Sequence, residues 1–464
     1  MGPLDIRREL IAIVGDSDVT FSPDHHPDDL HDESLHPEST IPYAVVRPTT
    51  TSQVSQIAAL ASEHGIAITP RGSGTGLSGG ATPVPNGIVM SFAKMNQLLR
   101  LDTRDHVAVV QPGITLRELG EALAASGLRY PVYPGELSGS LGGNVNTNAG
   151  GMRAVRHGVT RHHVLGLELV LIDGTVVRTG GPVVKSSSGY DLTQLVIGSE
   201  GTLAMVTEVT IKLSPSMPHS TTVLVPFRTL EEVTRIVPTI VGSGLEPSML
   251  EYLDVLTMAA ISKAADLELG VLPAVVEQTA AYLIIVLETR TRSQLDDDIA
   301  ELAFIVEGAG ALDVYVLAPS AGTRLIEARE RAFWVGKAAG ANEIIDIVVP
   351  RSSVPSFLIE ANEIARRHDA FISGCGHVGD GNVHLSVFLP DDVKRATMLL
   401  ELFSYGVSLG GQISGEHGIG RDKLAPYLEL TDPVLLELQR RIKRAFDPKQ
   451  LLNPYRLLDD RPMP

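Results

Sequence analysis

The segment Pro-Arg-Gly-Ser-Gly-Thr-Gly-Leu-Ser-Gly-Gly at residues 70–80 limits how the first half of the chain can fold. Residues 74–79 match the spacing Gly-x-Gly-x-x-Gly of a dinucleotide-binding loop. That loop needs a helix directly after it, because the helix N-terminus binds the pyrophosphate. Here residues 81–87 contain two prolines and lead into a strand-like run at 88–92, which excludes a Rossmann loop. No Gly-Lys-Ser/Thr ends the segment, so it is not a P-loop. A nest of backbone N–H groups around a diphosphate and a plain surface loop both stay open.

Two later glycine-rich segments favour a binding function for the first one. Residues 134–151 read Pro-Gly-Glu-Leu-Ser-Gly-Ser-Leu-Gly-Gly-Asn-Val-Asn-Thr-Asn-Ala-Gly-Gly, with three asparagines among small residues. Surface linkers seldom carry so many hydrogen-bonding side chains, whereas a flat polar ring system would suit such close packing. A third segment, Gly-Ser-Glu-Gly-Thr-Leu at 198–203, directly precedes a strong strand pattern.

Near the C-terminus, the segments Gly-His-Val-Gly-Asp-Gly-Asn-Val-His (376–384) and Gly-Glu-His-Gly-Ile-Gly (415–420) bring histidine and glutamate together among glycines. His377, His384 and Glu416 offer two imidazoles and one carboxylate, a set that suits Zn²⁺, Mn²⁺ or Fe²⁺ with open coordination positions. His417 would then remain as a proton acceptor. Structural histidines are the alternative. A second histidine group, at 157–163, is interpreted as a polar loop, and Cys375 as a small apolar filler.

The bulk composition restricts the class of protein. A chain of 464 residues is too long for one core and fits two or three domains. Its formal net charge of -17 argues against a nucleic-acid partner, which needs a basic surface. One cysteine excludes an internal disulfide and fits a reducing compartment. With no signal core at the N-terminus, we expect a soluble cytoplasmic protein, and peripheral contact with a membrane stays open.

The periodicity of apolar residues outlines the domains. We expect helices at 4–15 and 51–64, strands at 66–69, 165–172 and 203–213, and a hairpin turn at Asp173-Gly174. After two prolines near 215–220, longer helices (229–242, 293–308, 353–367) alternate with strands (281–288, 312–317, 383–388), and a last helix covers 433–454. The expected units are an N-terminal helical segment at 1–40, a cofactor domain at 41–218 and a C-terminal domain at 219–464.

These motifs resemble the FAD-binding proteins of the vanillyl-alcohol oxidase / p-cresol methylhydroxylase superfamily. The resemblance covers about residues 42–215 and 370–454. Within the superfamily, the chain is similar to the branch that holds the FAD-linked glycolate oxidases, FAD-linked D-lactate dehydrogenase and D-2-hydroxyglutarate dehydrogenase. The resemblance implies an α+β protein: an FAD-binding domain of that type and an α+β substrate (cap) domain with an antiparallel sheet. Residues 415–464 would pack back toward the flavin.

The resemblance also implies which residues contact FAD. Residues 71–77 would wrap the pyrophosphate, residues of the second glycine-rich segment would line the flavin and ribityl chain, Val206 would contact the ring, and Asn453 would approach from the C-terminal segment. The full set is Arg71, Gly72, Ser73, Gly74, Thr75, Gly76, Leu77, Pro134, Glu136, Leu137, Ser138, Gly143, Asn144, Thr147, Gly151, Val206 and Asn453. Many members attach the flavin through a histidine in the first loop. Residues 70–80 contain none, so we expect non-covalent FAD.

By the same resemblance, His377, His384 and Glu416 would bind a divalent metal, with Zn²⁺ preferred over Mn²⁺ or Fe²⁺. His417 would be the catalytic base, and Lys337 and Asn382 would orient the substrate carboxylate. Relatives often carry arginine where Lys337 stands, and lysine lacks the bidentate fork of arginine.

The resemblance finally implies the reaction. Relatives acting on 2-hydroxyglutarate carry lysine where this chain has Ile344, so we expect a monocarboxylate. The expected reaction oxidises a small D-2-hydroxy acid, D-lactate or glycolate first, with a quinone, a cytochrome or an electron-transfer flavoprotein as acceptor. A homodimer stays open. Alternatives are a D-2-hydroxyglutarate dehydrogenase, an oxygen-using oxidase, and a flavin-binding protein without catalytic activity that serves a larger complex.

Overall fold

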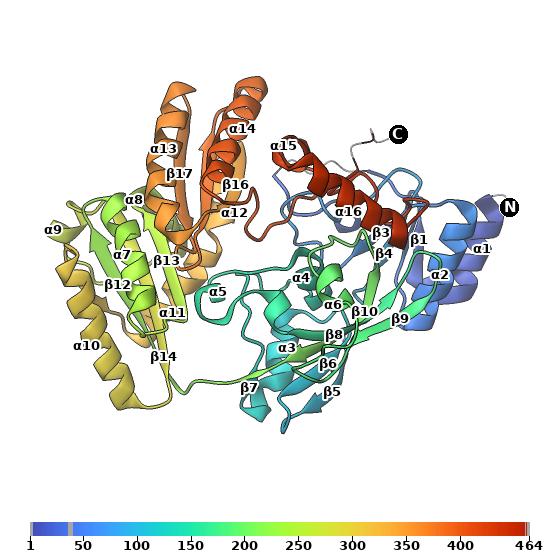
Figure 1. Ribbon diagram of the computed structural model, residues 1–464, viewed down its shortest axis with the longest axis horizontal. Helices are drawn as coiled ribbons and strands as arrows, with labels where there is room; N and C mark the ends of the chain where they lie inside the picture. Colours follow the sequence, from blue (N-terminus) through green and yellow to red (C-terminus); the bar gives the residue numbers. More distant parts are fainter. Residues whose placement is uncertain (1–2, 36–39, 460, 462–464) are drawn as a thin grey trace.

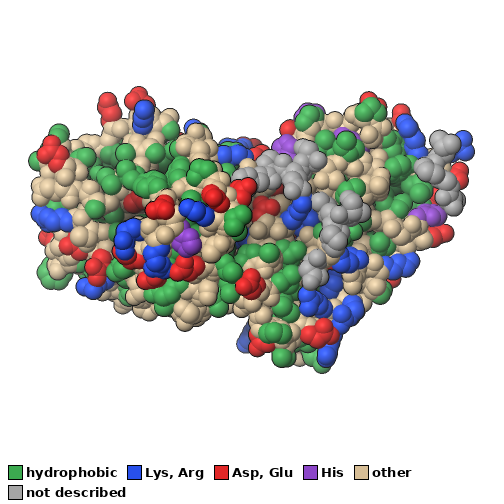
Figure 2. All heavy atoms as spheres, turned by 90° about the horizontal axis from the view of Figure 1, so that it is seen from above, with side chains coloured by type: hydrophobic (Ala, Val, Ile, Leu, Met, Phe, Trp, Pro, Cys, Tyr) green, Lys and Arg blue, Asp and Glu red, His purple; other side chains and the backbone are tan. Residues whose placement is uncertain are grey.

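The computed structural model describes residues 3–35, 40–459 and 461. Two lobes lie side by side along the long axis of the molecule (Figure 1). One lobe is built from the first half of the chain and from the C-terminal helix α16 (Pro433–Phe446), whereas helix α15 (Leu424–Leu430) packs against the apolar core of the other lobe. The other is built around a single large sheet from residues 219–408. Figure 2 shows acidic and basic side chains close together on that second lobe, as on an ordinary solvated surface.

The first lobe begins with a four-stranded sheet in the order β1-β2-β4-β3. Strands β2 (Ala44–Val46), β4 (Ile88–Ser91) and β3 (Ile68–Arg71) are parallel, and β1 (Val19–Phe21) is antiparallel to β2. Helices α1 (Pro3–Val14) and α2 (Thr51–His64) pack on it through an apolar cluster. The N-terminal segment, expected to be helical, thus also contributes a strand.

Local sequence explains the sharp limits of α2, which match the expected helix. Thr50 accepts a hydrogen bond from the Gln53 N–H at 3.3 Å, and Gly65 ends the helix with a φ of 67°. After β3, residues 72–80 form no helix, and the next regular element is β4. The exclusion of a Rossmann loop is therefore confirmed.

A second sheet in this lobe has five antiparallel strands. They are, in spatial order, β5 (Leu98–Asp102), β6 (Val107–Val110), β10 (Met205–Lys212), β8 (Val164–Val170) and β9 (Val176–Gly180). The predicted hairpin at Asp173-Gly174 is confirmed, because it joins β8 to β9. Smaller elements complete the lobe: α3 (Leu116–Leu123), β7 (Leu128–Arg129), α4 (Leu141–Thr147), α5 (Ala154–His157), α6 (Leu192–Val196) and β11 (Ser214–Pro215).

The second lobe is a seven-stranded sheet in which every described pairing is antiparallel. Its order is β15 (Tyr315–Val316), β12 (His219–Phe227), β14 (Ala281–Thr289), β13 (Met249–Asp254), β17 (Phe371–Gly376), β18 (Asn382–Phe388) and β16 (Glu343–Val348). Two apolar clusters on opposite faces seat the helices. One face carries α7 (Leu230–Gly242), α10 (Arg292–Gly308), α13 (Val354–Arg367) and α14 (Asp392–Ser408). The other carries α8 (Val255–Ala265), α11 (Pro319–Glu330) and α12 (Ala332–Ala338), while α9 (Pro273–Val276) is a short connection.

The C-terminal segment returns to the first lobe. Ile68 of β3 exchanges backbone hydrogen bonds with Leu451 (2.8 Å) and Asn453 (2.7 Å). The buried Lys443 ammonium donates to the Thr202 carbonyl at 2.7 Å, tying α16 to the same lobe. The helix expected over 433–454 ends at Phe446, because a residue before proline, here Asp447, avoids helical backbone. Within the part of the chain described here, no helix combines the length and apolar character that a bilayer crossing requires.

Candidate active site between two cavities

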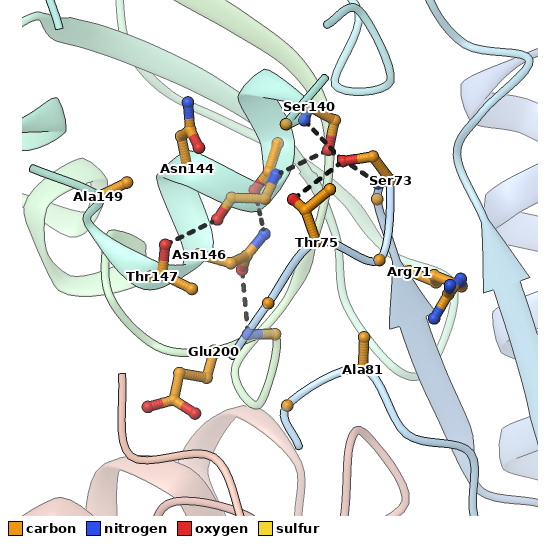
Figure 3. Close-up of a pocket in the computed structure, with 18 of the residues that line it drawn as sticks. Arg71, Ser73, Thr75, Ala81, Ser140, Asn144, Asn146, Thr147, Ala149 and Glu200 are labelled. Atoms are coloured by element: carbon orange, nitrogen blue, oxygen red, sulfur yellow. Dashed lines mark hydrogen bonds between the residues drawn. The ribbon is translucent and has the colours of Figure 1, made fainter. Parts of the chain in front are cut away.

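The first cavity lies inside the first lobe and encloses about 1300 Å³ of space that opens to solvent. The glycine-rich loop after β3, helix α4 and the segment at 198–203 form much of its wall (Figure 3). The loop and α4 are tied together, because the Ser140 N–H donates to Ser73 Oγ at 2.9 Å. A side chain at Gly72 would collide with the Ser140 hydroxyl, so a larger residue there would displace that hydroxyl.

Most residues expected to contact FAD line this first cavity. They are Arg71, Gly72, Ser73, Gly74, Thr75, Gly76, Leu77, Pro134, Glu136, Gly143, Asn144, Thr147, Val206 and Asn453. Leu137, Ser138 and Gly151 lie outside the lining. Leu137 packs against the core of the five-stranded sheet, the Ser138 N–H donates to Glu136, and Gly151 takes a φ of 101° tight against the Tyr133 carbonyl.

Arg71 contributes backbone to the cavity, but its guanidinium turns away from it (Figure 3). The side chain donates to the backbone carbonyls of His31, at 2.7 Å, and Asp28. Two buried polar atoms of the lining, Asn144 Nδ2 and Asn453 Oδ1, have no hydrogen-bond partner among the described residues. Unpaired polar atoms on a cavity wall fit a polar ligand such as FAD.

His377, His384 and Glu416 meet at one point, although Glu416 comes from a segment distant in sequence from the two histidines. Glu416 Oε1 lies 3.0 Å from His377 Nε2 and 3.3 Å from His384 Nε2. One ligand atom from each residue falls within 4.8 Å of the others, as metal coordination requires. Glu416 Oε2 and His384 Nδ1 are buried without hydrogen-bond partners among the described residues, so this donor set fits a divalent cation.

Glu251 on β13 holds the other face of the His377 ring. Its carboxylate oxygens lie 2.7 and 2.8 Å from His377 Nδ1, which leaves Nε2 for the cluster. Arg329 on α11 lies 2.9 Å from the same carboxylate. Burial opposes a charge on His377, but Glu251 and Glu416 outweigh it and raise its pKa well above the usual range. Burial also opposes a charge on Glu416, yet the histidines lower its pKa.

His417 lies beside this cluster, with its ring stacked on that of His384 at 5.2 Å between centroids. Burial lowers the pKa of His417 to about 4, against the attraction of Asp346, so the ring is neutral near pH 7. Asp346 also fixes the backbone here, since its Oδ2 accepts the N–H groups of Glu416 at 3.1 Å and His417 at 2.9 Å. The base form of His417 is therefore held in one place.

A second cavity of about 890 Å³ opens next to the first. The two share part of their lining, namely Thr75, Leu77, Pro134, Glu136, Glu416 and His417. The remaining walls of the second cavity include His377, His384, Arg329, Ile344 and the aromatic pair Phe333 and Trp334. The histidine–glutamate cluster therefore lies where the two cavities meet.

The two residues expected to orient a substrate carboxylate lie outside both cavity linings. Lys337 extends over Trp334, and its Nζ is 3.5 Å from the Ser34 carbonyl. The Asn382 amide is buried and donates to Asp346 Oδ1 at 2.8 Å. The basic side chain that does line the second cavity is Arg329, whose Nε has no partner among the described residues.

Four residues with evident roles in this geometry were missed by sequence reasoning: Glu251, Arg329, Asp346 and Glu200. Glu200 belongs to the glycine-rich segment 198–203, so a motif drew attention to its neighbourhood but not to its role. Asp346 lies between Ile345 and Ile347 in β16, and a lone carboxylate in an apolar strand signals a buried, paired group. Glu251, between Leu250 and Tyr252 in β13, carries the same signal, whereas Arg329 carries none that is comparable.

The remaining histidine group stays apart from both cavities. His163 Nε2 lies 2.8 Å from the His157 carbonyl, and burial together with Arg129 lowers the pKa of His157 to about 4. Among the described residues, the groups with metal-ligand spacing are His377–His384–Glu416 and Asp346–His384–His417. The interpretation of 157–163 as a polar loop is consistent with this arrangement.

Comparison with known proteins gives the family. Residues 42–180 match the FAD binding domain, and residues 216–457 match the C-terminal domain of FAD linked oxidases. An uncharacterized FAD-linked oxidoreductase of Mycobacterium tuberculosis is 51% identical, with 89% of this chain and 90% of that protein covered. D-lactate dehydrogenase of Archaeoglobus fulgidus is 38% identical (90% and 91% covered), and glycolate oxidase subunit GlcD of Bacillus subtilis is 36% identical (90% and 89% covered).

Among solved structures, p-cresol methylhydroxylase with substrate bound superposes with a TM-score of 0.79 at 19% identity, covering 98% of this chain and 97% of that one. At this identity the likeness concerns the fold, and it confirms the expected FAD-binding domain joined to a cap domain with an antiparallel sheet. The family is shown by the two matched domains together with the relatives above 35% identity. The chain belongs to the FAD-linked oxidases, as an FAD-binding oxidoreductase of the group that includes glycolate oxidase subunit GlcD and D-lactate dehydrogenase.

Proposed function

We propose that this protein oxidises a small D-2-hydroxy monocarboxylate to the 2-oxo acid, with non-covalent FAD in the first cavity and the substrate in the second. D-lactate and glycolate are the first candidates. One observation carries the proposal: the adjacent residues Glu416 and His417 line both cavities. A metal ligand and a neutral base therefore face the space for the cofactor and the space for the substrate at once.

In the proposed reaction, His417 takes the proton of the substrate hydroxyl while the C2–H bond breaks and its hydrogen leaves with the electron pair. The Nδ1 atom of His417 faces Asp346 at 3.9 Å, so Nε2 is the nitrogen that receives the proton. When bound, FAD supplies the acceptor for the hydride. A divalent cation held by His377, His384 and Glu416, with Zn²⁺ preferred over Mn²⁺ or Fe²⁺, would polarise the hydroxyl.

We assign the substrate carboxylate to Arg329 and not to Lys337 or Asn382. Arg329 is buried, lines the second cavity and has an Nε without a hydrogen-bond partner in the described part of the chain, whereas Lys337 and Asn382 lie outside the lining. Its contact with Glu251 uses one edge of the guanidinium, and five N–H donors leave others for a ligand. The fork of arginine also suits a carboxylate better than the ammonium of lysine.

The walls of the second cavity favour a monocarboxylate. Arg329 and the three histidines are the only basic side chains among the described residues that line it. A second substrate carboxylate would meet Ile344 or the acidic Glu136 and Glu330 instead of a cation. Burying an unpaired charge is costly, so a dicarboxylate such as D-2-hydroxyglutarate should bind less well.

Anaerobic stopped-flow mixing of the purified flavoprotein with each acid tests the proposal. D-lactate or glycolate should bleach the flavin faster than D-2-hydroxyglutarate, and acid should release the FAD from the denatured chain. His384→Ala and metal chelation should both abolish bleaching with FAD still bound, while His64→Ala, a half-buried histidine at the end of α2 that lies outside both cavity linings, should not. Absence of bleaching by every D-2-hydroxy acid, or full activity in metal-free protein, would overturn the proposal.

The electron acceptor and the assembly follow as further proposals. A quinone, a cytochrome or an electron-transfer flavoprotein would reoxidise the flavin, and turnover can be assayed with each in turn. Reoxidation by molecular oxygen at the same rate would instead identify an oxidase. A homodimer is a proposal that sedimentation velocity can test directly.

A further inference from the structure

A buried carboxylate of the first lobe, Glu200, holds the turn that carries Glu416 and His417. Glu200 Oε1 accepts the Ile419 N–H and Oε2 accepts the Gly420 N–H, each at 2.7 Å. Glu200 is only 9% exposed, so solvent competes little with these bonds. A carboxylate that accepts two backbone N–H groups forms charge-assisted bonds, which are the stronger class.

The backbone of Glu200 is fixed by the walls of the first cavity. Its N–H donates to the Asn146 carbonyl at 2.7 Å, and its own carbonyl accepts from Asn453 Nδ2 at 2.8 Å. Asn146, Asn453 and Glu200 itself all line that cavity. Glu200 adopts a φ of 53°, which is uncommon outside glycine and sends its side chain away from the wall toward the C-terminal segment (Figure 3).

The second lobe binds the other side of the same turn. Asp346 of β16 accepts the N–H groups of residues 415–417, as described above. Ser78, from the first glycine-rich loop, adds a weaker tether, since its hydroxyl lies 3.3 Å from the His417 carbonyl and 3.1 Å from that of Gly418. His417 thus lies in a short loop whose two ends are fixed by different lobes.

We infer that Glu200 is a positioning residue that sets the placement of His417 relative to the cofactor in the first cavity. Both of its carboxylate oxygens accept N–H groups of the turn. Asp346 alone would fix His417 within the second lobe, but Glu200 and Ser78 connect the turn to the lobe that holds the flavin. This inference rests on the proposed function, in which His417 must face substrate and flavin together. A displacement of about 1 Å can lower a rate on the order of 10²-fold.

Two variants and one control test the inference in the FAD-loaded protein. Glu200→Gln keeps the shape, but its amide offers one acceptor oxygen for two N–H groups. Glu200→Asp keeps the charge, and we expect it to retain part of the positioning that the parent residue provides. Glu208→Gln is the control, because it removes a partly buried carboxylate from the neighbouring strand β10, where the described partner is Arg178.

Hydrogen–deuterium exchange and stopped-flow reduction by D-lactate are the two measurements. In Glu200→Gln, the amides of Ile419 and Gly420 should exchange about tenfold faster or more, the effect of losing one charge-assisted bond. The limiting rate of flavin reduction should fall on the order of 10²-fold, with the substrate dissociation constant and the FAD content within about threefold of the parent. The exchange and reduction rates of Glu200→Asp should lie between those of Glu200→Gln and the parent, and the rates of Glu208→Gln should match those of the parent.

Each outcome bears on a different statement. Faster exchange with an unchanged reduction rate, or loss of FAD without a change in exchange, would overturn the positioning role and leave the proposed function intact. If D-lactate and the other acids do not reduce the parent protein, the proposed function fails, while the exchange result still tests the tether. Should Glu200→Gln fail to fold, Glu200→Asp serves in its place, and faster exchange of Ile419 and Gly420 with an unchanged reduction rate in that variant would also overturn the inference.

Discussion

Replacing Glu251 by glutamine should weaken the proposed metal binding without removing any of the three proposed ligands. The Glu251 side chain is fully buried and lies 2.7 Å from His377 Nδ1 and 2.9 Å from Arg329. Glutamine keeps the shape but removes the charge that orients the imidazole and raises its basicity. Loss of such a partner typically costs 10–100-fold in metal affinity, or about 1.4–2.7 kcal/mol. The structure adds a second cost, because the Arg329 guanidinium loses its buried counter-charge.

The second cost is a loss of folding stability. Removing one member of a buried ion pair usually costs about 3–5 kcal/mol, and glutamine should fall near the lower end because it retains an acceptor oxygen. Competition with a chromophoric chelator measures the metal affinity, and calorimetry measures the stability. Glu246→Gln serves as the control, since the Glu246 side chain is 74% exposed and its ion pair with Arg156 is long, at 3.9 Å.

The two measurements separate two roles of Glu251. If the variant loses stability but binds metal as tightly as the parent, then Glu251 is only the counter-ion of Arg329. In that case His377 is not held as a ligand by this contact, and the reasoning that links the buried chain Arg329–Glu251–His377 to the metal site is refuted.

Four further outcomes are expected. Ile344→Lys should raise kcat/KM for D-2-hydroxyglutarate relative to D-lactate by about tenfold, the effect of one modest ion pair, and an unchanged ratio in steady-state assays would contradict the assigned cavity. His417→Asn should retain FAD and metal but reduce the flavin about 10²–10⁴-fold more slowly. If the variant instead lost metal and kept its reduction rate, the roles assigned to residues 416 and 417 would be wrong. Burial raises the pKa of Glu330 from 4.5 to about 7, so the folded state holds a proton that the unfolded state releases. The free energy of unfolding therefore falls as pH rises through that window. Glu330→Gln should flatten the fall in melting temperature between about pH 5 and about pH 8. Lys443→Met should cost about 3–5 kcal/mol in denaturant unfolding, because it leaves the buried Asp447 without its partner at 2.6 Å, whereas exposed Lys449→Met should cost little.

The parts of the fold that sequence predicted are those that local chemistry determines. Helix α2 begins and ends where Thr50 and Gly65 require, and the hairpin between β8 and β9 follows from Asp173-Gly174. The prolines after residue 81 correctly exclude a helix behind the glycine-rich loop. Strand β1 was missed because three residues carry little periodicity, and its pairing with β2 depends on a contact distant in sequence.

The predicted site divides in the same way. Glycine-rich motifs mark the loops that must approach a ligand closely, and most of their residues line the first cavity. The assignment of Lys337 relied on its position relative to Trp334, but the helix α12 turns that side chain toward the Ser34 carbonyl. Arg329 lies on a different helix, α11, and only the packing of α11 against the sheet brings it to Glu251 and the second cavity. Such a position depends on tertiary structure, which no local pattern encodes.

The pairing of the roles proposed for residues 416 and 417 depends on backbone geometry more than on the two side chains. Consecutive residues of a strand point to opposite faces, so an extended backbone would send only one of them into the site. Here the chain turns instead: Gly418 has a φ of 84°, and the N–H groups on both sides of it are taken by carboxylates. Asp346 and Glu200 therefore replace the partners that a regular strand would have supplied. Because those carboxylates come from different lobes, the turn that directs both side chains to one place also requires the two lobes to be joined correctly.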